Sequence, residues 1–236
     1  MNAQLSERYA LVGGTRRYVV RSATAASVPA ASNNGVWEAA LASGASLSND
    51  TILCVESITG GAIEVRPVAY RSYFEARSRG GQRMRPLAVS GFIADAGRIL
   101  VGRRPSDVTQ YPGLLEAIPS GSIDRIEGDG SVDPNAALLR ELAEEAGIEE
   151  QFAALGQALL IHDLFEDMFD LCYRIYLSIS MQDAMVRARR VGHYREISCV
   201  GAMDLLAQSD ELVPTTLAIV DHLLVRGAFA KKNGAQ

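Results

Sequence analysis

The sequence predicts an α/β protein that begins with a small β-rich region. Paired β-rich runs separated by glycine turns recur along the chain, and helical patterns join them in its second half. A chain of 236 residues with 48% hydrophobic and 22% charged residues can bury a core of ordinary size. We therefore expect an N-terminal α+β region over 1–86, with a linker at 22–34, and a larger domain over 87–236.

Most of the expected strands form hairpins, because short turns rich in glycine or acidic residues separate them. The connection from 77 to 85, which is rich in glycine and arginine, is predicted to be a loop. The expected elements before the second half are a strand at 16–21, a helix at 36–42, and strands at 51–58, 62–70, 87–94 and 98–103. Further strands are expected at 157–165 and 171–180, and a final amphipathic helix at 214–226.

A helix is predicted from Pro134 to Ala146, with a signal at each end. Asp133 is a favourable N-cap residue, and proline is well tolerated at the first helical position. Gly147 readily adopts the left-handed conformation that ends many helices. The sequence therefore defines both ends of this helix.

Three acidic residues of this helix, Glu141, Glu144 and Glu145, lie on one side of it, because positions three and four residues apart are neighbours on a helix. Their charges repel one another close to the negative end of the helix dipole. A hard cation such as Mg²⁺, which binds oxygen ligands, would remove this cost. From the three glutamates alone, the alternative is an acidic helix face exposed to solvent.

The surrounding residues resemble the Nudix box, whose pattern is G-x5-E-x7-R-E-U-x-E-E-x-G-U, where U is an aliphatic residue. The segment from Arg140 to Ile148 matches every fixed position in the second half of this pattern. The first half is matched by Gly121 and by Glu127, which follows it after five residues. The chain is thus identified as similar to the Nudix hydrolases over 121–148, with a looser likeness over about 87–226.

The spacing within the box departs from the family pattern. Twelve residues separate Glu127 from Arg140, where the pattern has seven. The loop before the helix therefore carries about five additional residues, in the segment 128–133. Either Glu127 or a residue of this loop, such as Asp133, fills the position of the first glutamate of the box.

The resemblance implies an α/β/α sandwich with a mixed sheet, and a hydrolase that cleaves a phosphoanhydride bond with Mg²⁺ or Mn²⁺. By the same resemblance, Glu144 and Glu145 bind the cation, and Glu141 is either a third ligand or the base that activates water. Arg140 would hold the carboxylates in place. Many members use a further acid from outside the box, for which we favour Glu196; Glu166 and Asp167 are the alternatives.

The substrate phosphates are expected to meet basic residues near the box. The segment 64–104 holds nine arginines and three acidic residues, a net charge of +6, against −11 for the rest of the chain. We predict that Arg103 and Arg104 bind phosphate and that Gly121 lines the substrate site. Tyr70, Tyr73 and Phe74 are candidates for stacking on a base, although aromatic residues in such runs are usually buried.

The expected substrate is a nucleoside diphosphate linked to another group. A weak likeness to the hydrolases of UDP-sugars in the N-terminal region favours a nucleotide sugar, and it rests on Trp37, Leu41, the pair Asn49-Asp50, and Tyr70-Arg71 with Tyr73. ADP-ribose, nucleoside triphosphates and dinucleotides are the alternatives, because one fold hosts many functions. A Nudix-fold regulator that binds a ligand without turnover is the rival class.

Composition also limits the partners and the location of the protein. The longest apolar runs are of strand length, shorter than the ~20 residues that a membrane helix needs. Residues 1–9 do not resemble a secretory signal, so we expect a cytoplasmic protein. The expected partner is a small molecule rather than a nucleic-acid polymer or a membrane, and a homodimer is a candidate assembly.

Overall fold

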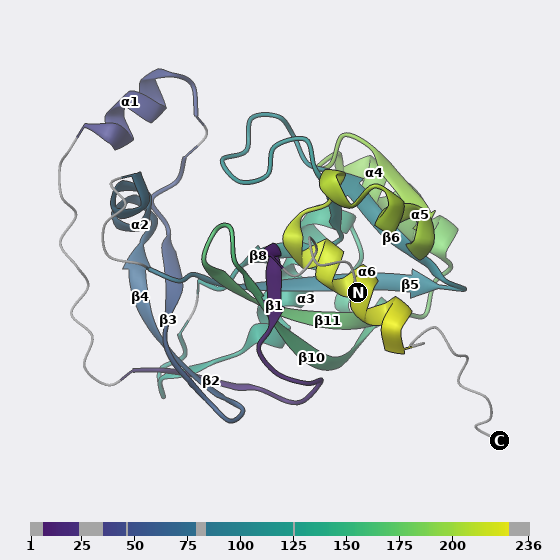
Figure 1. Ribbon diagram of the computed structural model, residues 1–236, viewed down its shortest axis with the longest axis horizontal. Helices are drawn as coiled ribbons and strands as arrows, with labels where there is room; N and C mark the ends of the chain where they lie inside the picture. Colours follow the sequence, from purple (N-terminus) through teal and green to yellow (C-terminus); the bar gives the residue numbers. More distant parts are fainter. Residues whose placement is uncertain (1–6, 24–34, 46, 79–83, 125, 227–236) are drawn as a thin grey trace.

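The computed structural model describes residues 7–23, 35–45, 47–78, 84–124 and 126–226. It contains two β-sheets, one of eight strands and one of four, with helices beside each of them (Figure 1). The predicted linker at 22–34 lies mostly outside the described residues. The prediction of an α/β protein is confirmed.

The larger sheet is mixed, because β11 pairs in parallel with β5 while the other neighbours pair antiparallel. Its main path runs in the order β1-β10-β11-β5-β6-β12, with β7 paired to β6 and β8 paired to β5. These strands are β1 (Tyr9–Leu11), β5 (Leu87–Asp95), β6 (Arg98–Arg103), β7 (Leu115–Ala117), β8 (Ser120–Ser122), β10 (Ala153–Asp163), β11 (Met168–Leu177) and β12 (Ile197–Gly201).

Helices cover both faces of this sheet. On β6, Leu100 packs into the core beneath α3 (Pro134–Ala146) and α4 (Met181–Val191). Its neighbours Ile99 and Val101 point the other way, toward α5 (Ala202–Ala207) and α6 (Pro214–Arg226). Figure 1 shows α6 in front of the sheet and α3 behind it. Since side chains alternate along a strand, these apolar runs are buried on both sides, as the expected α/β/α sandwich requires.

The smaller sheet has the strand order β3-β4-β2-β9 and stands beside the larger one (Figure 1). Two helices, α1 (Val36–Ala42) and α2 (Tyr70–Ser78), accompany it. Its strands are β2 (Val19–Ser22), β3 (Thr51–Thr59), β4 (Ala62–Ala69) and β9 (Ser131–Val132). Ile52, Cys54, Val68 and Tyr73 form a small core between the hairpin and α2.

Strand pairing crosses the predicted domain boundary between residues 86 and 87 in both directions. From the N-terminal side, β1 pairs with β10, so Tyr9 lies opposite Asp163 in the larger sheet. From the C-terminal side, β9 pairs with β2, so Val132 lies opposite Val20 in the smaller sheet. Because β9 belongs to the additional residues before α3, the insertion in the box joins the two sheets.

Several expected elements have the bounds that the sequence predicts, and others do not. The helices at 36–42, 134–146 and 214–226 are confirmed. The strand expected at 171–180 begins and ends three residues earlier, at Met168 and Leu177. Tyr70 was expected to end a strand and Arg77 to begin a loop, but both belong to α2. At the first turn of this helix, Asn49 Oδ1 accepts a hydrogen bond from the Arg71 amide at 3.0 Å, which satisfies an amide that has no partner within the helix.

A buried carboxyl group lies between the larger sheet and α6. Asp170 accepts hydrogen bonds from the Ser90 hydroxyl at 2.7 Å and the Thr215 hydroxyl at 3.1 Å. Burial nevertheless raises the pKa of Asp170 from 3.8 to about 7, because removal from water disfavours the charged form. The folded protein therefore keeps a proton that the unfolded chain loses as the pH rises above about 4.

The first prediction follows from this difference in proton binding. As the pH rises from about 4 to 7, the free energy of unfolding of the wild type should fall relative to that of Asp170→Asn, by up to about 1.4 kcal/mol per pH unit. Urea unfolding at a series of pH values measures the two curves. Asp107→Asn, which changes an exposed acid, is the control and should run parallel to the wild type. Parallel curves for Asp170→Asn as well would contradict the prediction.

Candidate active site

The three glutamates of the predicted site are positioned by α3, whose ends form as its sequence predicts. The Asp133 side chain accepts hydrogen bonds from the amides of Asn135 and Ala136, at 2.9 and 3.2 Å. Gly147 ends the helix in the left-handed conformation, with φ of 62°. Leu138 and Leu142 are fully buried against the larger sheet. The opposite edge of α3, which carries Glu141 and Glu144, therefore borders open space.

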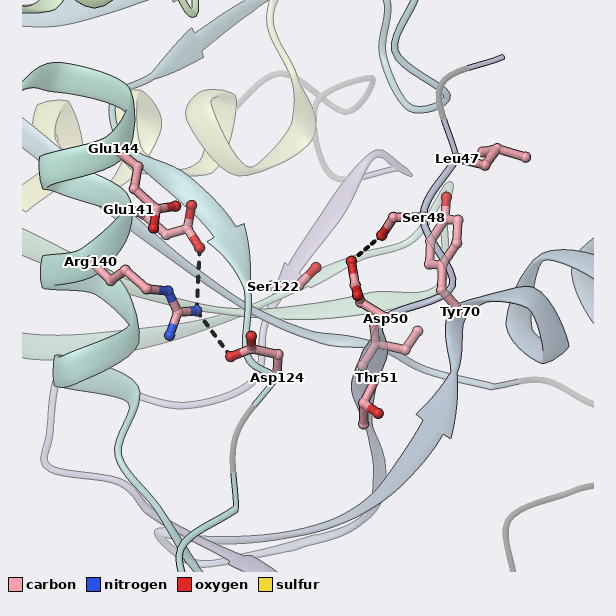
Figure 2. Close-up of a pocket in the computed structure, with 11 residues that line it drawn as sticks. Leu47, Ser48, Asp50, Thr51, Tyr70, Ser122, Asp124, Arg140, Glu141 and Glu144 are labelled. Atoms are coloured by element: carbon pink, nitrogen blue, oxygen red, sulfur yellow. Dashed lines mark hydrogen bonds and ion pairs between the residues drawn. The ribbon is translucent and has the colours of Figure 1, made fainter. Parts of the chain in front are cut away.

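A pocket of about 480 Å³ lies between α3 and the smaller sheet (Figure 2). One wall carries acidic side chains and one arginine, and the other wall comes from the N-terminal region. The residues of the first wall are Ser122, Asp124, Arg140, Glu141 and Glu144; those of the second are Leu47, Ser48, Asp50, Thr51, Ile52 and Tyr70. The volume is within the usual range for small-molecule sites.

Glu141 is the most perturbed carboxyl group of the pocket. Burial raises its pKa from 4.5 to about 7, and the charges of Glu145 and Glu144 act in the same direction. Arg140 opposes the shift, with its guanidinium 3.6 Å from the Glu141 carboxylate. A carboxyl group that titrates near neutrality can accept a proton from water or bind a cation in place of its own proton.

Glu145 points away from the pocket into a buried network. One of its oxygens accepts hydrogen bonds from the Ser120 amide at 3.0 Å and from the Tyr194 hydroxyl at 2.9 Å. Its other oxygen lies 3.0 Å from His193 Nε2. The hydrogen bond to Glu145 also raises the pKa of His193. Glu145 is therefore held in a fixed orientation immediately beneath Glu141.

The same network includes an ion pair between the partly buried Arg104 and the buried Glu116. Glu116 also accepts a hydrogen bond from the Ser120 hydroxyl at 2.9 Å. It lies 3.2 Å from the Tyr194 hydroxyl, whose single proton is shared between Glu116 and Glu145. Burial, then the charges of Glu116 and Glu145, raises the pKa of Tyr194 well above its ordinary value, so its hydroxyl remains a donor. Tyr194 thus connects Glu116 to Glu145.

Arg140 forms an ion pair with Asp124, which lies near the beginning of the box. Its guanidinium donates to Asp124 at 3.0 Å, whereas Glu127 is exposed in the loop that leads to β9. The carboxylate that contacts Arg140 thus precedes the insertion and comes three residues after Gly121.

The predicted phosphate ligands and the predicted further acid bind other protein groups. Arg103 pairs with Glu196 at 3.0 Å and with Glu211 at 3.2 Å, and it donates to the Gly113 carbonyl at 2.8 Å. Arg104 pairs with Glu116. Glu196 is exposed and does not belong to the described residues that line the pocket.

The two alternative acids lie in the turn between β10 and β11. Glu166 pairs with Arg77 of α2 at 2.5 Å, and Asp167 lies 2.8 Å from His162. These contacts connect the turn to α2 and to β10. The structure therefore brings Glu141 and Glu144 together in the pocket, places Glu145 beneath them, and separates Glu196, Glu166 and Asp167 from them.

Sequence reasoning did not single out Glu116, Asp124, His193 or Tyr194. Each lacks a recognisable motif, and His193 and Tyr194 come from the loop between α4 and β12, nearly 50 residues after Glu145. Only the packing of this loop against α3 brings them to the site. The single available signal was Glu116, an acid within the otherwise apolar strand before the glycine turn.

The carboxylates of the pocket are suitable ligands for a divalent cation, but their side chains do not point toward one common position. Hard oxygen donors are what Mg²⁺ prefers, and Glu141 and Glu144 both face the pocket (Figure 2). In the described part of the chain, no three His, Cys, Asp or Glu side chains converge on a point that could hold a metal ion. A bound cation would require Glu141 and Glu144 to turn toward a common point.

One family model matches part of the chain. Residues 84–182 match the family model of the NUDIX domain, and this segment includes α3, the pocket glutamates and most of the larger sheet. This match confirms the resemblance of the box to the Nudix family over that segment. No curated protein matches the sequence. No helix in the described ranges is long and apolar enough to cross a membrane.

Several solved structures are similar to part of this chain. DR0079 from Deinococcus radiodurans is 15% identical, with a TM-score of 0.42 over 58% of this chain and 81% of that one. NrtR from Shewanella oneidensis is 16% identical, with a TM-score of 0.43 over 59% of this chain and 62% of that one. A bifunctional NMN adenylyltransferase/ADP ribose pyrophosphatase from Francisella tularensis is 13% identical, with a TM-score of 0.42 over 64% of this chain and 44% of that one.

Gly121 permits the close approach of Glu141 to β8. A Cβ atom added at this position would overlap the Glu141 carboxyl group, which rests directly on the glycine. We predict that Gly121→Ala leaves the fold intact but displaces this carboxyl group. Since a misplacement of about 1 Å can reduce a rate ~10²-fold, kcat should fall by roughly that factor.

The control for this prediction is Gly128→Ala, because a Cβ atom at Gly128 meets no atom within 4 Å. Steady-state kinetics and thermal melting of both variants give the measurement. A Gly121→Ala enzyme with wild-type kcat would show that the position of Glu141 is unimportant for turnover.

Proposed function

We propose that this protein is a Mg²⁺-dependent hydrolase that cleaves the phosphoanhydride bond of a nucleoside diphosphate linked to another group, with a nucleotide sugar as the first candidate. The observation that carries the proposal is the pairing of Glu141 and Glu144 of the Nudix helix in one pocket of substrate size. Mn²⁺ is the alternative cation.

The charge of the pocket supports a metal requirement. Its lining includes four carboxylates, from Asp50, Asp124, Glu141 and Glu144. Arg140 is the one cation among the described lining residues, and it is already engaged by Asp124 and Glu141. An anionic diphosphate would be repelled from such a pocket, whereas a divalent cation bound with it would offset the repulsion.

The residues of the chain then divide the work as follows. Glu144 and Glu141 would hold the cation, whereas Glu145 would reach it only by leaving the buried network that binds both of its oxygens. Ser120, Tyr194 and His193 orient Glu145, and Arg140 restrains Glu141 through their ion pair. In the alternative role, without the cation bound to it, Glu141 has a pKa near 7 and is suited to take a proton from the attacking water. When bound, the cation would neutralise charge on the diphosphate and lower the pKa of a water molecule.

A hydrolysis screen tests the proposed activity. The purified chain is incubated with nucleotide sugars, ADP-ribose, nucleoside triphosphates, dinucleoside polyphosphates and coenzyme A, each with Mg²⁺ or Mn²⁺, and the product masses identify the bond that breaks. Turnover of a nucleotide sugar with the highest kcat/KM supports the proposal. Preference for another substrate would change the substrate class, and binding without turnover by any of them would support a ligand-binding regulator instead.

The metal requirement has a test that does not depend on activity. Mg²⁺ should raise the melting temperature of the wild type, because a ligand that binds only the folded state stabilises it. The same titration should have little effect on Glu144→Gln. Equal shifts for the two proteins would place the metal elsewhere.

A further inference from the structure

The pocket has a second wall, which the N-terminal region supplies and which the proposed hydrolysis does not use. We propose that this wall binds the group attached to the diphosphate, that this group is uncharged and rich in hydroxyls, and that Asp50 and Tyr70 determine the specificity for it. Figure 2 shows Asp50, Ser48, Thr51 and Tyr70 across the pocket from Glu141 and Glu144. The inference rests on the proposed function, because it assigns a subsite within the same pocket.

The second wall is part of a folded unit. The Asp50 carbonyl accepts a hydrogen bond from the Tyr70 amide at 2.9 Å, which attaches the segment before β3 to the start of α2. The Asp50 carboxylate accepts a hydrogen bond from the Ser48 hydroxyl. The backbone of Asp50 is therefore attached to α2, and Ser48 contacts its carboxylate in the pocket.

Tyr70 is held from behind by other aromatic rings. The centroid of its ring lies 6.3 Å from that of Trp37 and 6.4 Å from that of Phe74. Its hydroxyl lies 3.2 Å from the Thr109 hydroxyl, in the loop between β6 and β7. Because α1, α2 and this loop all contact Tyr70, its ring is a fixed surface at the edge of the pocket.

The chemistry of this wall favours a neutral ligand with hydroxyl groups. Its polar side chains are one carboxylate and three hydroxyls, from Asp50, Ser48, Thr51 and Tyr70, and no cation lies among the described residues of this wall. A carboxylate repels phosphate but accepts strong hydrogen bonds from hydroxyl groups. The ring of Tyr70 adds an apolar face on which the C–H groups of a sugar ring can pack.

The two walls thus have different tasks. The wall on α3 would bind the diphosphate through a cation, and the wall of the N-terminal region would bind the remainder of the substrate. The N-terminal region is then a specificity module that is attached to the Nudix domain through the β2–β9 and β1–β10 pairs.

The experiment compares two diphosphate esters of the same nucleoside, one carrying a hexose and the other a methyl group. The nucleoside is the one that the hydrolysis screen selects, and the protein is the full chain with Mg²⁺. Asp50→Ala should lower kcat/KM for the hexose ester roughly 10- to 100-fold, the usual effect of losing a hydrogen bond to a charged group. The methyl ester should be affected less than about twofold, because it has no hydroxyl for Asp50 to recognise.

Three further variants sharpen the result. Asp50→Asn keeps an acceptor oxygen and should recover part of the loss, and Tyr70→Leu should also lower kcat/KM for the hexose ester selectively. Asp210→Ala removes an exposed acid that does not line the pocket, and it should behave as wild type with both esters. Equal losses for the two esters in Asp50→Ala, or no loss for either, would overturn the inference while leaving the proposed function intact.

A binding measurement separates the two proposals if neither ester is hydrolysed. That result would overturn the proposed function, and calorimetric titration of UDP-glucose and the methyl ester of UDP would then decide the inference. Weaker binding of UDP-glucose alone by Asp50→Ala would support it. Unchanged affinity for both would overturn it.

Discussion

Replacing Glu144 by Gln should reduce turnover by orders of magnitude and leave the fold unchanged. The substitution preserves the shape of the side chain but removes the charge of the proposed metal ligand, and metal stabilisation of a transition state contributes several kcal/mol. Glu144 is exposed at the pocket, in contrast to the buried Glu145, so its loss disturbs little packing. The kinetic effect of Glu144→Gln is therefore separable from any effect on stability.

Glu149→Gln is the matched control for this prediction. Glu149 is also an exposed acid, but it follows the end of α3 and does not line the pocket. Mg²⁺ titration of activity, together with thermal melting, is measured for both variants. If the acidic face of α3 were merely solvated, the two substitutions would behave alike and both would retain wild-type turnover.

Glu145→Gln should combine a loss of turnover with a loss of stability. The carboxylate of Glu145 has hydrogen-bond partners at both oxygens, and an amide cannot replace both as an acceptor. Glu144→Gln should lose turnover alone, whereas Glu145→Gln should lose both turnover and stability. Comparing the two variants therefore separates the effect of a pocket charge from the effect of the buried network.

Arg104→Ala should lower the free energy of unfolding by about 3 kcal/mol, the lower end of the range for breaking a buried ion pair. Glu116 would keep the hydroxyls of Ser120 and Tyr194 but lose its cation, and it is only 7% exposed. Burial acts to lower the pKa of Arg104, but the charge of Glu116 and its hydrogen bond raise it, so the pKa lies above its ordinary value. Denaturant unfolding measures the loss.

A double variant and a control complete the measurement. Arg104→Ala with Glu116→Gln should be more stable than Arg104→Ala alone, because no uncompensated charge remains. Arg98→Ala, at an exposed arginine, should have a small effect. If Arg104 also binds phosphate, as the sequence predicts, Arg104→Ala should raise KM by roughly 10- to 150-fold. An unaltered KM in the folded variant would show that Arg104 does not bind the substrate.

Local chemistry made much of the fold predictable. The helix that carries the glutamates has an N-cap aspartate, a proline at its first position and a glycine at its end, so its bounds depend on the nearest neighbours in sequence. The hairpin of β3 and β4 is likewise set by its glycine turn. Spacing alone predicted that Glu141, Glu144 and Glu145 share one side of the helix.

Prediction from local pattern failed where distant contacts decide the conformation. The start of α2 reads as the end of a strand, because its aromatic residues favour β structure, yet Asn49 and the Trp37 ring stabilise it as a helix. The inserted loop before α3 reads as a turn, yet its end pairs with β2. Strand pairing of this kind depends on a partner more than 100 residues away.

The sequence by itself determined the resemblance to the Nudix box and the helix that carries its glutamates, because these depend on a short motif whose residues are neighbours on the helix. Only the tertiary structure decided how the three glutamates differ. Folding turns Glu145 inward to Tyr194 and His193, leaves Glu144 exposed, and partly buries Glu141 so that its pKa rises to about 7. The tertiary structure also placed Asp50 and Tyr70 opposite them, since that juxtaposition results from the packing of two sheets and leaves no trace in local sequence.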